Sequence, residues 1–140
     1  MKVYIAAPLF NESELERNRG MRDFVRGLGF ETYLPQEDGG IAFDLIKSGA
    51  RLQETRKRIF ENDMEQVKTC DIFLCILDGR VPDEGLCIEL GYAYALGKTC
   101  VGYLTDKRSL DEYGINLMIE GCLPDIAHSR EELHDILTKL

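Results

Sequence analysis

Short runs rich in apolar and β-branched residues alternate along the chain with longer segments whose apolar residues recur at helical spacing. The short runs predict five strands, at residues 2–7, 30–34, 71–77, 99–104 and 124–127. The longer segments predict helices at residues 11–28 and 51–68, around Glu89 as far as Gly97, at 116–120, and after Ser129. Residues 36–49, which include two adjacent glycines, are expected to form a loop.

Several polar residues are placed to begin these helices. Asn11 or Ser13 is expected to cap the first helix, and Ser129 the last, where Glu132 stands three residues on as in a capping box. Gly29 follows the first helix at the position where a helix commonly stops.

The regular alternation of strands and helices predicts the fold class. We expect an α/β, flavodoxin-like, doubly wound parallel sheet of five strands in the order 2-1-3-4-5, with helices on both faces. Residues 1–140 contain no repeat and no long linker, which indicates a single domain. In such folds a ligand binds outside the carboxyl ends of the first and third strands, at residues 6–11 and 78–83.

Composition narrows the classes of function. A net charge of −8 argues against binding of nucleic-acid polymers, and neither GxGxxG nor GxxxxGK(S/T) occurs. The five cysteines form no CxxC pair and read as core residues of a reducing compartment, so no metal site and no cysteine nucleophile are expected. No apolar run reaches the roughly 20 residues of a membrane span, and no signal peptide is recognisable; a soluble, cytoplasmic protein is expected.

The helix around Glu89 carries the most informative pattern. Glu89 is the only charged residue between Glu84 and Lys98, and apolar residues surround it on every side of the helix. A carboxylate in such surroundings is costly unless it is paired, hydrogen-bonded or protonated. It is either a structural group that caps a neighbouring backbone or a group retained for chemistry.

Three further residues join Glu89 as candidates for an active site. Asp83 is placed to cap the Glu89 helix or to contact a ligand at the crevice. Asp63 interrupts an apolar helical stripe, either at its solvent edge or facing the site. Tyr4 lies on the first strand, where its hydroxyl group is either part of the core or able to orient a carboxylate.

At this point the chain resembles the nucleoside 2-deoxyribosyltransferase family over nearly its whole length. The matching pieces are VYIAAPLF at 3–10, NDMEQVKTCD at 62–71, DEGLCIELGYAYALGK at 83–98 and INLM at 115–118. The third piece is the most specific, because a D-x-G-x-x-x-E-x-G-x-A-x-x-x-G-K pattern rarely arises by chance. The resemblance implies exchange of the nucleobase of a 2′-deoxynucleoside, without metal or organic cofactor, in a homo-oligomer (a dimer or a trimer of dimers).

The resemblance also implies roles for individual residues. It makes Glu89 the nucleophile, Asp63 and Asp83 the aspartates near the base, and Tyr4 the residue that positions the nucleophile. It makes Asn116 a residue that reaches the sugar 5′-hydroxyl across a subunit interface. It adds three substrate-binding positions: Phe10, Met118 and, in a loop that aligns poorly, Gln36.

The position of Asp63 conflicts with the simplest geometry. A plain helix over 51–68 places Asp63 about 18 Å from its start, pointing away from the crevice. We therefore expect either a later helix start or a helix that crosses the site at an unusual angle.

Two rival functions fit parts of the sequence. A 2′-deoxynucleoside 5′-monophosphate N-glycosidase would use the same glutamate with water as acceptor, but residues 7–11 lack the phosphate donors that such an enzyme needs. A non-catalytic nucleotide-sensing module would bind nucleosides without turning them over. Base range and ribose tolerance are not encoded in these motifs; the 36–49 loop is expected to set the base range.

Overall fold

A computed structural model describes residues 1–39, 51–106, 108 and 114–140. Its centre is one parallel sheet with the strand order β2-β1-β3-β4-β5, which confirms the predicted topology. The strands are β1 (Lys2–Ala6), β2 (Glu31–Tyr33), β3 (Ile72–Ile76), β4 (Thr99–Tyr103) and β5 (Asp125–Ala127). The central strand β3 is buried along its whole length, as expected for a strand covered on both faces.

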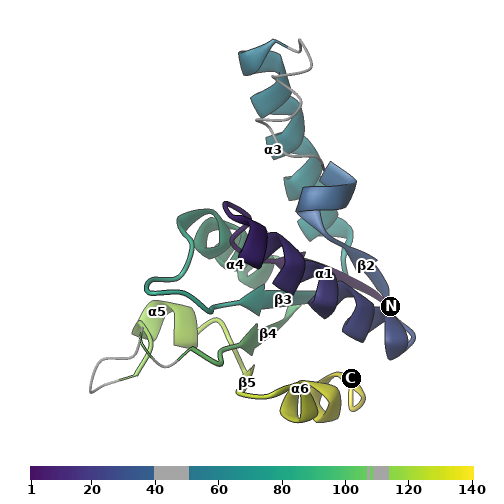
Figure 1. The fold of residues 1–140 in the computed structure, drawn as a ribbon, viewed down its shortest axis with the longest axis vertical. Coiled ribbons are helices and arrows are strands. Elements are labelled where there is room, and N and C mark those ends of the chain that lie inside the picture. The colour runs from purple at the N-terminus through teal and green to yellow at the C-terminus, as the bar shows by residue number, and fades with distance from the viewer. Residues whose placement is uncertain (40–50, 107, 109–113) are drawn as a thin grey trace.

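Helices connect the strands and cover both faces of the sheet (Figure 1). They are α1 (Glu12–Gly27), η1 (Pro35–Gly39), α3 (Leu52–Thr69), α4 (Glu84–Ala95), α5 (Leu117–Glu120) and α6 (Arg130–Leu137). The helix ends follow the local signals of the sequence. Asn11 caps α1, Ser129 caps α6, and Gly29 has a φ of +90°, a conformation that favours glycine.

The core divides into two layers, one on each face of the sheet. Alternate strand residues such as Val3 and Ile5 pack against Met21 of α1 and Leu133 of α6. The intervening residues pack against α3 and α4, and the largest side chains in this second layer are aromatic. The strand alternation therefore sends Tyr4 toward α3 and α4, the helices that carry the candidate acids.

Two features differ from the predictions. Residues 36–39 of the expected loop belong to η1, a single π-helical turn, and the rest of that loop lies outside the described residues. The turn follows Pro35, and Glu37 and Asp38 both donate their backbone N–H to Leu34 O. The second difference is α3, whose amino-terminal half extends well beyond the body of the domain (Figure 1).

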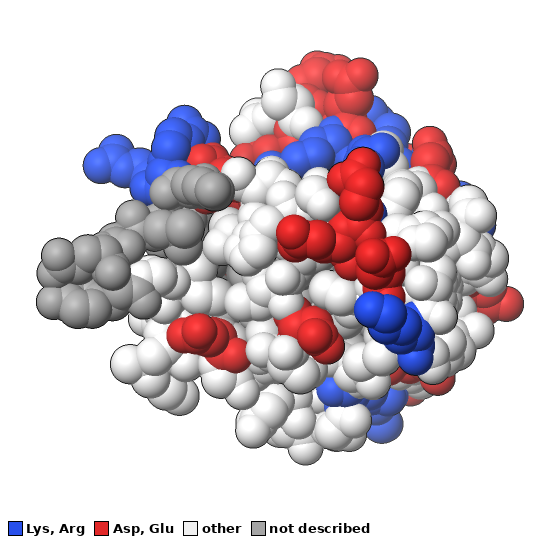
Figure 2. All heavy atoms as spheres, turned by 90° about the horizontal axis from the view of Figure 1, so that it is seen from below, with Lys and Arg blue, Asp and Glu red and all other residues white. Residues whose placement is uncertain are grey.

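The surface agrees with the acidic composition. On the face shown in Figure 2, acidic side chains occur at several separate places, and the basic side chains form no single continuous patch. Among the described residues, no helix has both the length and the apolar character needed to cross a membrane.

Candidate active site

A pocket of about 180 Å³ opens beside the carboxyl end of β1 and the start of α4. Three carboxylates meet there: one from α3, one from α4 and one from the residue that caps α4. The loop that follows β1 also contributes to the pocket. Its lining residues are Ala7, Leu9, Phe10, Pro35, Asp63, Asp83, Gly85, Leu86 and Glu89. Three of the four residues predicted to be catalytic thus share one pocket, and the fourth, Tyr4, contacts it through Glu89.

Glu89 lies in the second turn of α4 and is partly buried. Its Oε1 accepts a hydrogen bond of 2.8 Å from the hydroxyl group of Tyr4. Burial raises the pKa of Glu89 to about 7; the Tyr4 hydrogen bond opposes this rise, while the charges of Asp63 and Asp83 add to it. A carboxylate that is held by a tyrosine hydroxyl group beside an open pocket is available for reaction with a bound molecule.

Tyr4 is held rigidly beneath Glu89. Its side chain is fully buried and stacks between Tyr33 and Phe73, with 5.3 Å between ring centroids on each side. The stack follows from the sheet, because Tyr4 pairs with Tyr33 on β2 and with Phe73 on β3 in register. Burial, together with the charges of Glu89 and Asp63, raises the pKa of Tyr4 well above its usual range, so it remains a hydrogen-bond donor.

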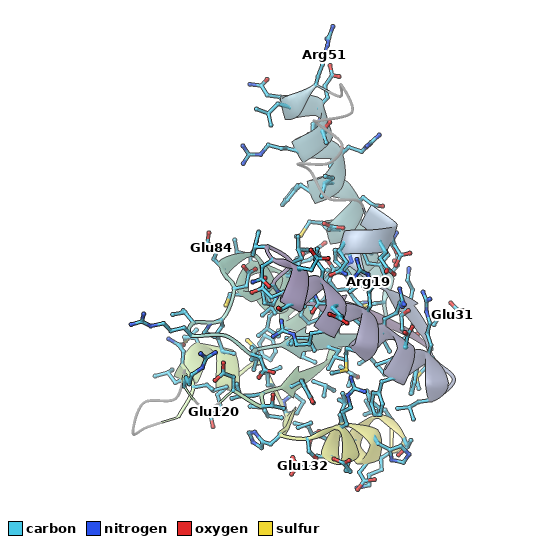
Figure 3. The ribbon with its side chains drawn as sticks, viewed as in Figure 1. Arg19, Glu31, Arg51, Glu84, Glu120 and Glu132 are labelled. Atoms are coloured by element: carbon cyan, nitrogen blue, oxygen red, sulfur yellow. The ribbon has the colours of Figure 1, made fainter. Side chains whose placement is uncertain are left out.

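Asp63 reaches the pocket because α3 is longer than the strands it covers. Counted from the carboxyl end at Thr69, Asp63 lies only about 9 Å along the helix, level with the pocket. The surplus length lies at the other end, where Figure 3 shows Arg51 at the tip of α3, far from Glu84 at the start of α4. Of the two expected resolutions, a later helix start is therefore wrong, since α3 begins at Leu52.

The surroundings of Asp63 favour a protonated state more than those of an exposed aspartate. Its Oδ1 accepts a hydrogen bond of 2.7 Å from the hydroxyl group of Tyr33. Burial raises the pKa of Asp63, and the Tyr33 hydrogen bond partly offsets the rise. No hydrogen bond between described residues uses its second oxygen, Oδ2.

Asp83 has the capping role predicted for it and also lies at the pocket. Its Oδ2 accepts 2.9 Å from the backbone N–H of Leu86, so it caps α4. It also lines the same pocket as Glu89. The cap holds one carboxylate oxygen of Asp83 on the helix, which fixes the side chain at the edge of the pocket.

The predicted substrate-binding residues lie in three different places. Phe10 lines the pocket and is 76% exposed, so its ring is available at the pocket's mouth. Gln36 is buried, and its amide group accepts from Asn18 and donates to Leu15 O, both at 2.9 Å. Those bonds tie η1 to α1, and Gln36 is not among the residues that line the pocket.

Asn116 and Met118 lie at a second, larger pocket of about 470 Å³. This pocket is formed with Cys87, Leu90 and Gly91 on a different side of α4 from Glu89. Asn116 caps α5 by accepting 2.9 Å from the backbone N–H of Met118. Within one subunit, neither residue therefore lines the carboxylate pocket.

Two site residues were not predicted from the sequence. Tyr33 donates to Asp63, and Asn62 Nδ2 donates to the Tyr33 hydroxyl oxygen at 2.6 Å. The predicted strand order contained a signal for Tyr33, because it places the second strand beside the first and thus Tyr33 beside Tyr4. The contact of Asn62 depends on the precise rotation of α3, which the sequence pattern does not determine.

Neither a metal site nor a thiol centre is formed by the described part of the chain. No group of three or more His, Cys, Asp or Glu side chains there is arranged to hold a metal ion. Cys87 follows Asp83 on α4, and burial and the charge of Asp83 raise the pKa of its thiol, which disfavours the reactive thiolate.

Several known proteins are similar to this chain in sequence. The sequence profile of the nucleoside 2-deoxyribosyltransferase family matches residues 3–126. A nucleoside deoxyribosyltransferase of Limosilactobacillus fermentum is 27% identical over 128 residues, covering 84% of this chain and 73% of that protein. An uncharacterised Schizosaccharomyces pombe protein is 32% identical over 115 residues, 79% of this chain; the match spans 53% of that relative's length.

A solved structure extends the match to three dimensions. The 2-deoxyribosyltransferase of Bacillus psychrosaccharolyticus has a TM-score of 0.78 and 30% identity to this chain, and covers 96% of this chain and 91% of its own. The family profile, which matches residues 3–126, includes every residue that lines the carboxylate pocket. The chain therefore belongs to the nucleoside 2-deoxyribosyltransferase family.

Proposed function

We propose that this protein exchanges the nucleobase of a 2′-deoxynucleoside for another free base, through a covalent deoxyribosyl intermediate on Glu89. The observation that carries the proposal is the contact of Glu89 with one fixed donor, Tyr4, in a pocket that holds two more carboxylates. The relatives named as deoxyribosyltransferases support the same reaction.

In the first half of the reaction the glycosidic bond between C1′ and the base breaks. The bonding electrons leave with the base, and positive charge develops at C1′ and the ring oxygen. An oxygen of ionised Glu89 then forms a bond to C1′, giving a deoxyribosyl ester. The pair of carboxyl groups used in this way resembles that of retaining glycosidases.

A proton must reach the departing base, because an anionic purine leaves poorly. Asp63 and Asp83 line the pocket together with Glu89 and are the two candidates for the proton donor. We assign the proton transfer to Asp63, because its pKa is raised by burial while Asp83 is engaged as a helix cap. Asp83 then serves to fix the bound base at the edge of the pocket.

The second half reverses these steps. A ring nitrogen of the incoming base attacks C1′, the ester bond breaks, and Glu89 regains its carboxylate. The proton of the incoming base returns to Asp63. Two displacements at C1′ give overall retention of configuration. Phe10, at the mouth of the pocket, offers an aromatic face to the substrate.

The sugar end of the substrate requires a second subunit in this proposal. Asn116 and Met118 lie away from the carboxylate pocket of their own chain, and Ile88, Leu117 and Met118 are 66%, 74% and 72% exposed. A symmetric partner would cover these apolar side chains and bring Asn116 to a neighbouring pocket.

Mixing two inactive variants tests the shared site. Glu89→Gln and Asn116→Ala, unfolded and refolded together, will regain about a quarter of wild-type activity if random dimers share sites across the interface. Simple mixing without refolding is the control for subunit exchange. Absence of recovery in a mixture shown to contain mixed oligomers contradicts a site built from two subunits.

Product analysis separates base exchange from the alternatives. The protein is incubated with 2′-deoxyinosine alone and with adenine, and products are separated by chromatography. Base exchange predicts 2′-deoxyadenosine, with slow hydrolysis when adenine is absent. Free deoxyribose at the same rate in both samples, or hydrolysis of 5′-monophosphates only, indicates the N-glycosidase; binding without turnover indicates a sensing module.

Trapping tests the covalent step. A 2-fluoro deoxynucleoside analogue slows the second displacement and allows the ester to accumulate. We expect the label on the peptide that contains Glu89. A label on another side chain contradicts the assignment of the nucleophile.

A further inference from the structure

Tyr33 contacts the proton-donating acid of the pocket and stacks on the residue that contacts the nucleophile. We propose that Tyr33 is a positioning residue that fixes Asp63 so that only its Oδ2 faces the leaving base. The inference rests on the proposed function and deepens it, since it assigns the reactive proton to one oxygen. Three features carry it: the direction of the hydrogen bonds, the aromatic stack and the close approach of Gly39.

The direction of the hydrogen bonds determines which oxygen carries the proton. Asn62 Nδ2 can only donate, so at 2.6 Å it makes the Tyr33 hydroxyl oxygen an acceptor. The single hydroxyl hydrogen of Tyr33 is then directed at Asp63 Oδ1, 2.7 Å away. Since Oδ1 is held as an acceptor, neutral Asp63 carries its proton on Oδ2.

The aromatic stack keeps this hydroxyl group in place. Tyr33 is buried, and its ring lies 5.3 Å from that of Tyr4 with 25° between the planes. Tyr4 in turn stacks on Phe73 with 14° between planes. Two neighbouring tyrosines thus serve two different acids, Tyr4 for Glu89 and Tyr33 for Asp63.

The end of η1 closes directly over the Tyr33–Asp63 hydrogen bond. A Cβ atom added to Gly39 would lie 2.6 Å from the Tyr33 hydroxyl oxygen and 2.9 Å from Asp63 Oδ1. Both distances are too short for real contacts, so any side chain at this position must displace the pair. Gly39→Ala therefore disturbs the hydrogen bond while leaving the Tyr33 hydroxyl group present.

The pH profile of kcat/KM for base exchange distinguishes positioning from simple packing. Proton transfer needs Glu89 ionised and Asp63 protonated, so each of the two acids sets one limb of the pH profile. Tyr33→Phe removes a donor that favours ionised Asp63, so the pKa of Asp63 rises and the limb set by Asp63 moves to higher pH. We expect a shift of about one unit and a loss on the order of tenfold to a hundredfold at the wild-type optimum.

Matched variants complete the experiment. Tyr103→Phe removes a hydroxyl from a buried strand tyrosine on the opposite face of the sheet and is expected to keep the wild-type profile. Gly39→Ala is expected to lower kcat/KM and shift the same limb as Tyr33→Phe. If Tyr33→Phe fails to fold, Gly39→Ala still tests the positioning role of Tyr33, because this variant retains the aromatic stack.

The outcomes separate the two proposals. If the wild-type protein exchanges bases but folded Tyr33→Phe or Gly39→Ala keeps the wild-type rate and both limbs, the role of Tyr33 is refuted. If the wild-type protein exchanges no base, the proposed function itself fails.

Discussion

Asp78 and Glu89 both follow β3 along the chain, but their carboxylates have very different surroundings. Asp78 lies two residues after the strand, is 8% exposed, and accepts three hydrogen bonds, from Thr105 N at 2.5 Å, Thr105 Oγ1 at 2.7 Å and Asp106 N at 2.8 Å. Among the described residues, Glu89 in α4 accepts a hydrogen bond from Tyr4 alone, and it borders a pocket with two further acids.

The difference shows how a carboxylate can serve structure or chemistry within a few residues of chain. Three donors satisfy the Asp78 carboxylate, and they join the end of β3 to the segment after β4. Glu89 lines the carboxylate pocket instead, and its pKa is raised to about 7, chiefly by burial. Substitutions at the two sites should therefore affect different measurements.

Glu89→Gln is the strongest test of this contrast. The amide side chain is nearly isosteric but forms no ester with C1′, so we expect kcat for base exchange to fall by at least about 1,000-fold. The free energy of unfolding should change by less than about 1 kcal/mol. Glu84→Gln, an exposed residue in the first turn of the same helix, is the matched control. Comparable activity of Glu89→Gln and the wild-type protein would contradict a chemical role of Glu89 and so remove its contrast with Asp78.

Asp63→Asn should give the next largest loss. Removing a general acid typically costs about 100- to 10,000-fold, and the cost depends on how badly the leaving group needs the proton. We expect the defect to shrink with a deoxyriboside whose base is more acidic than hypoxanthine. Glu65→Gln, on an exposed part of α3, is the control. An equal defect with every leaving group would indicate a role for Asp63 other than proton transfer.

Tyr4→Phe should shift the pH profile more than the maximal rate. The lost donor favoured ionised Glu89, so the pKa of Glu89 rises above about 7 and the limb set by Glu89 moves to higher pH by about one unit. At pH 6 this corresponds to a loss of up to about tenfold in kcat/KM, and above pH 8 the loss should be small. A shift of the limb to lower pH would show that the Tyr4 hydrogen bond does not favour the carboxylate.

Asp78→Asn should affect stability and leave chemistry almost unchanged. The new NH₂ group faces donors, so hydrogen bonds to a charged group are lost, at a cost of about 2–3 kcal/mol in the free energy of unfolding. Activity per folded molecule should remain within about twofold of wild type. Urea titration measures the free energy of unfolding. Active-site labelling with the 2-fluoro analogue counts the folded molecules, so that activity can be expressed per folded molecule. A stable but inactive variant would place Asp78 among the catalytic groups.

Much of this architecture could be read from the sequence, because the local signals agree with the global pattern. The alternation of strands and helices predicted the sheet order, and the helix caps at Asn11, Asp83 and Ser129 form as expected. The apolar neighbours of Glu89 along the chain indicate an unusual carboxylate from the sequence alone.

Other features depend on packing that a linear pattern does not encode. The π-helical turn η1 is tied to α1 through Gln36, a contact between residues far apart in the sequence. Asp63 lies far from the start of α3, which predicted a position away from the pocket. The carboxyl end of α3 is the end anchored beside the sheet, and Asp63 is close to that end. The roles of Tyr33 and Gly39 required the three-dimensional stack to be known.

The tyrosine stack also gives the molecule an internal optical reporter. The chain has no tryptophan and six tyrosines, so tyrosine dominates its near-ultraviolet absorption. Stacked phenol rings held in a fixed asymmetric arrangement contribute to the near-ultraviolet circular dichroism that marks ordered packing. Occupation of the adjacent pocket would then be visible as a change in this signal, without any label attached to protein or substrate.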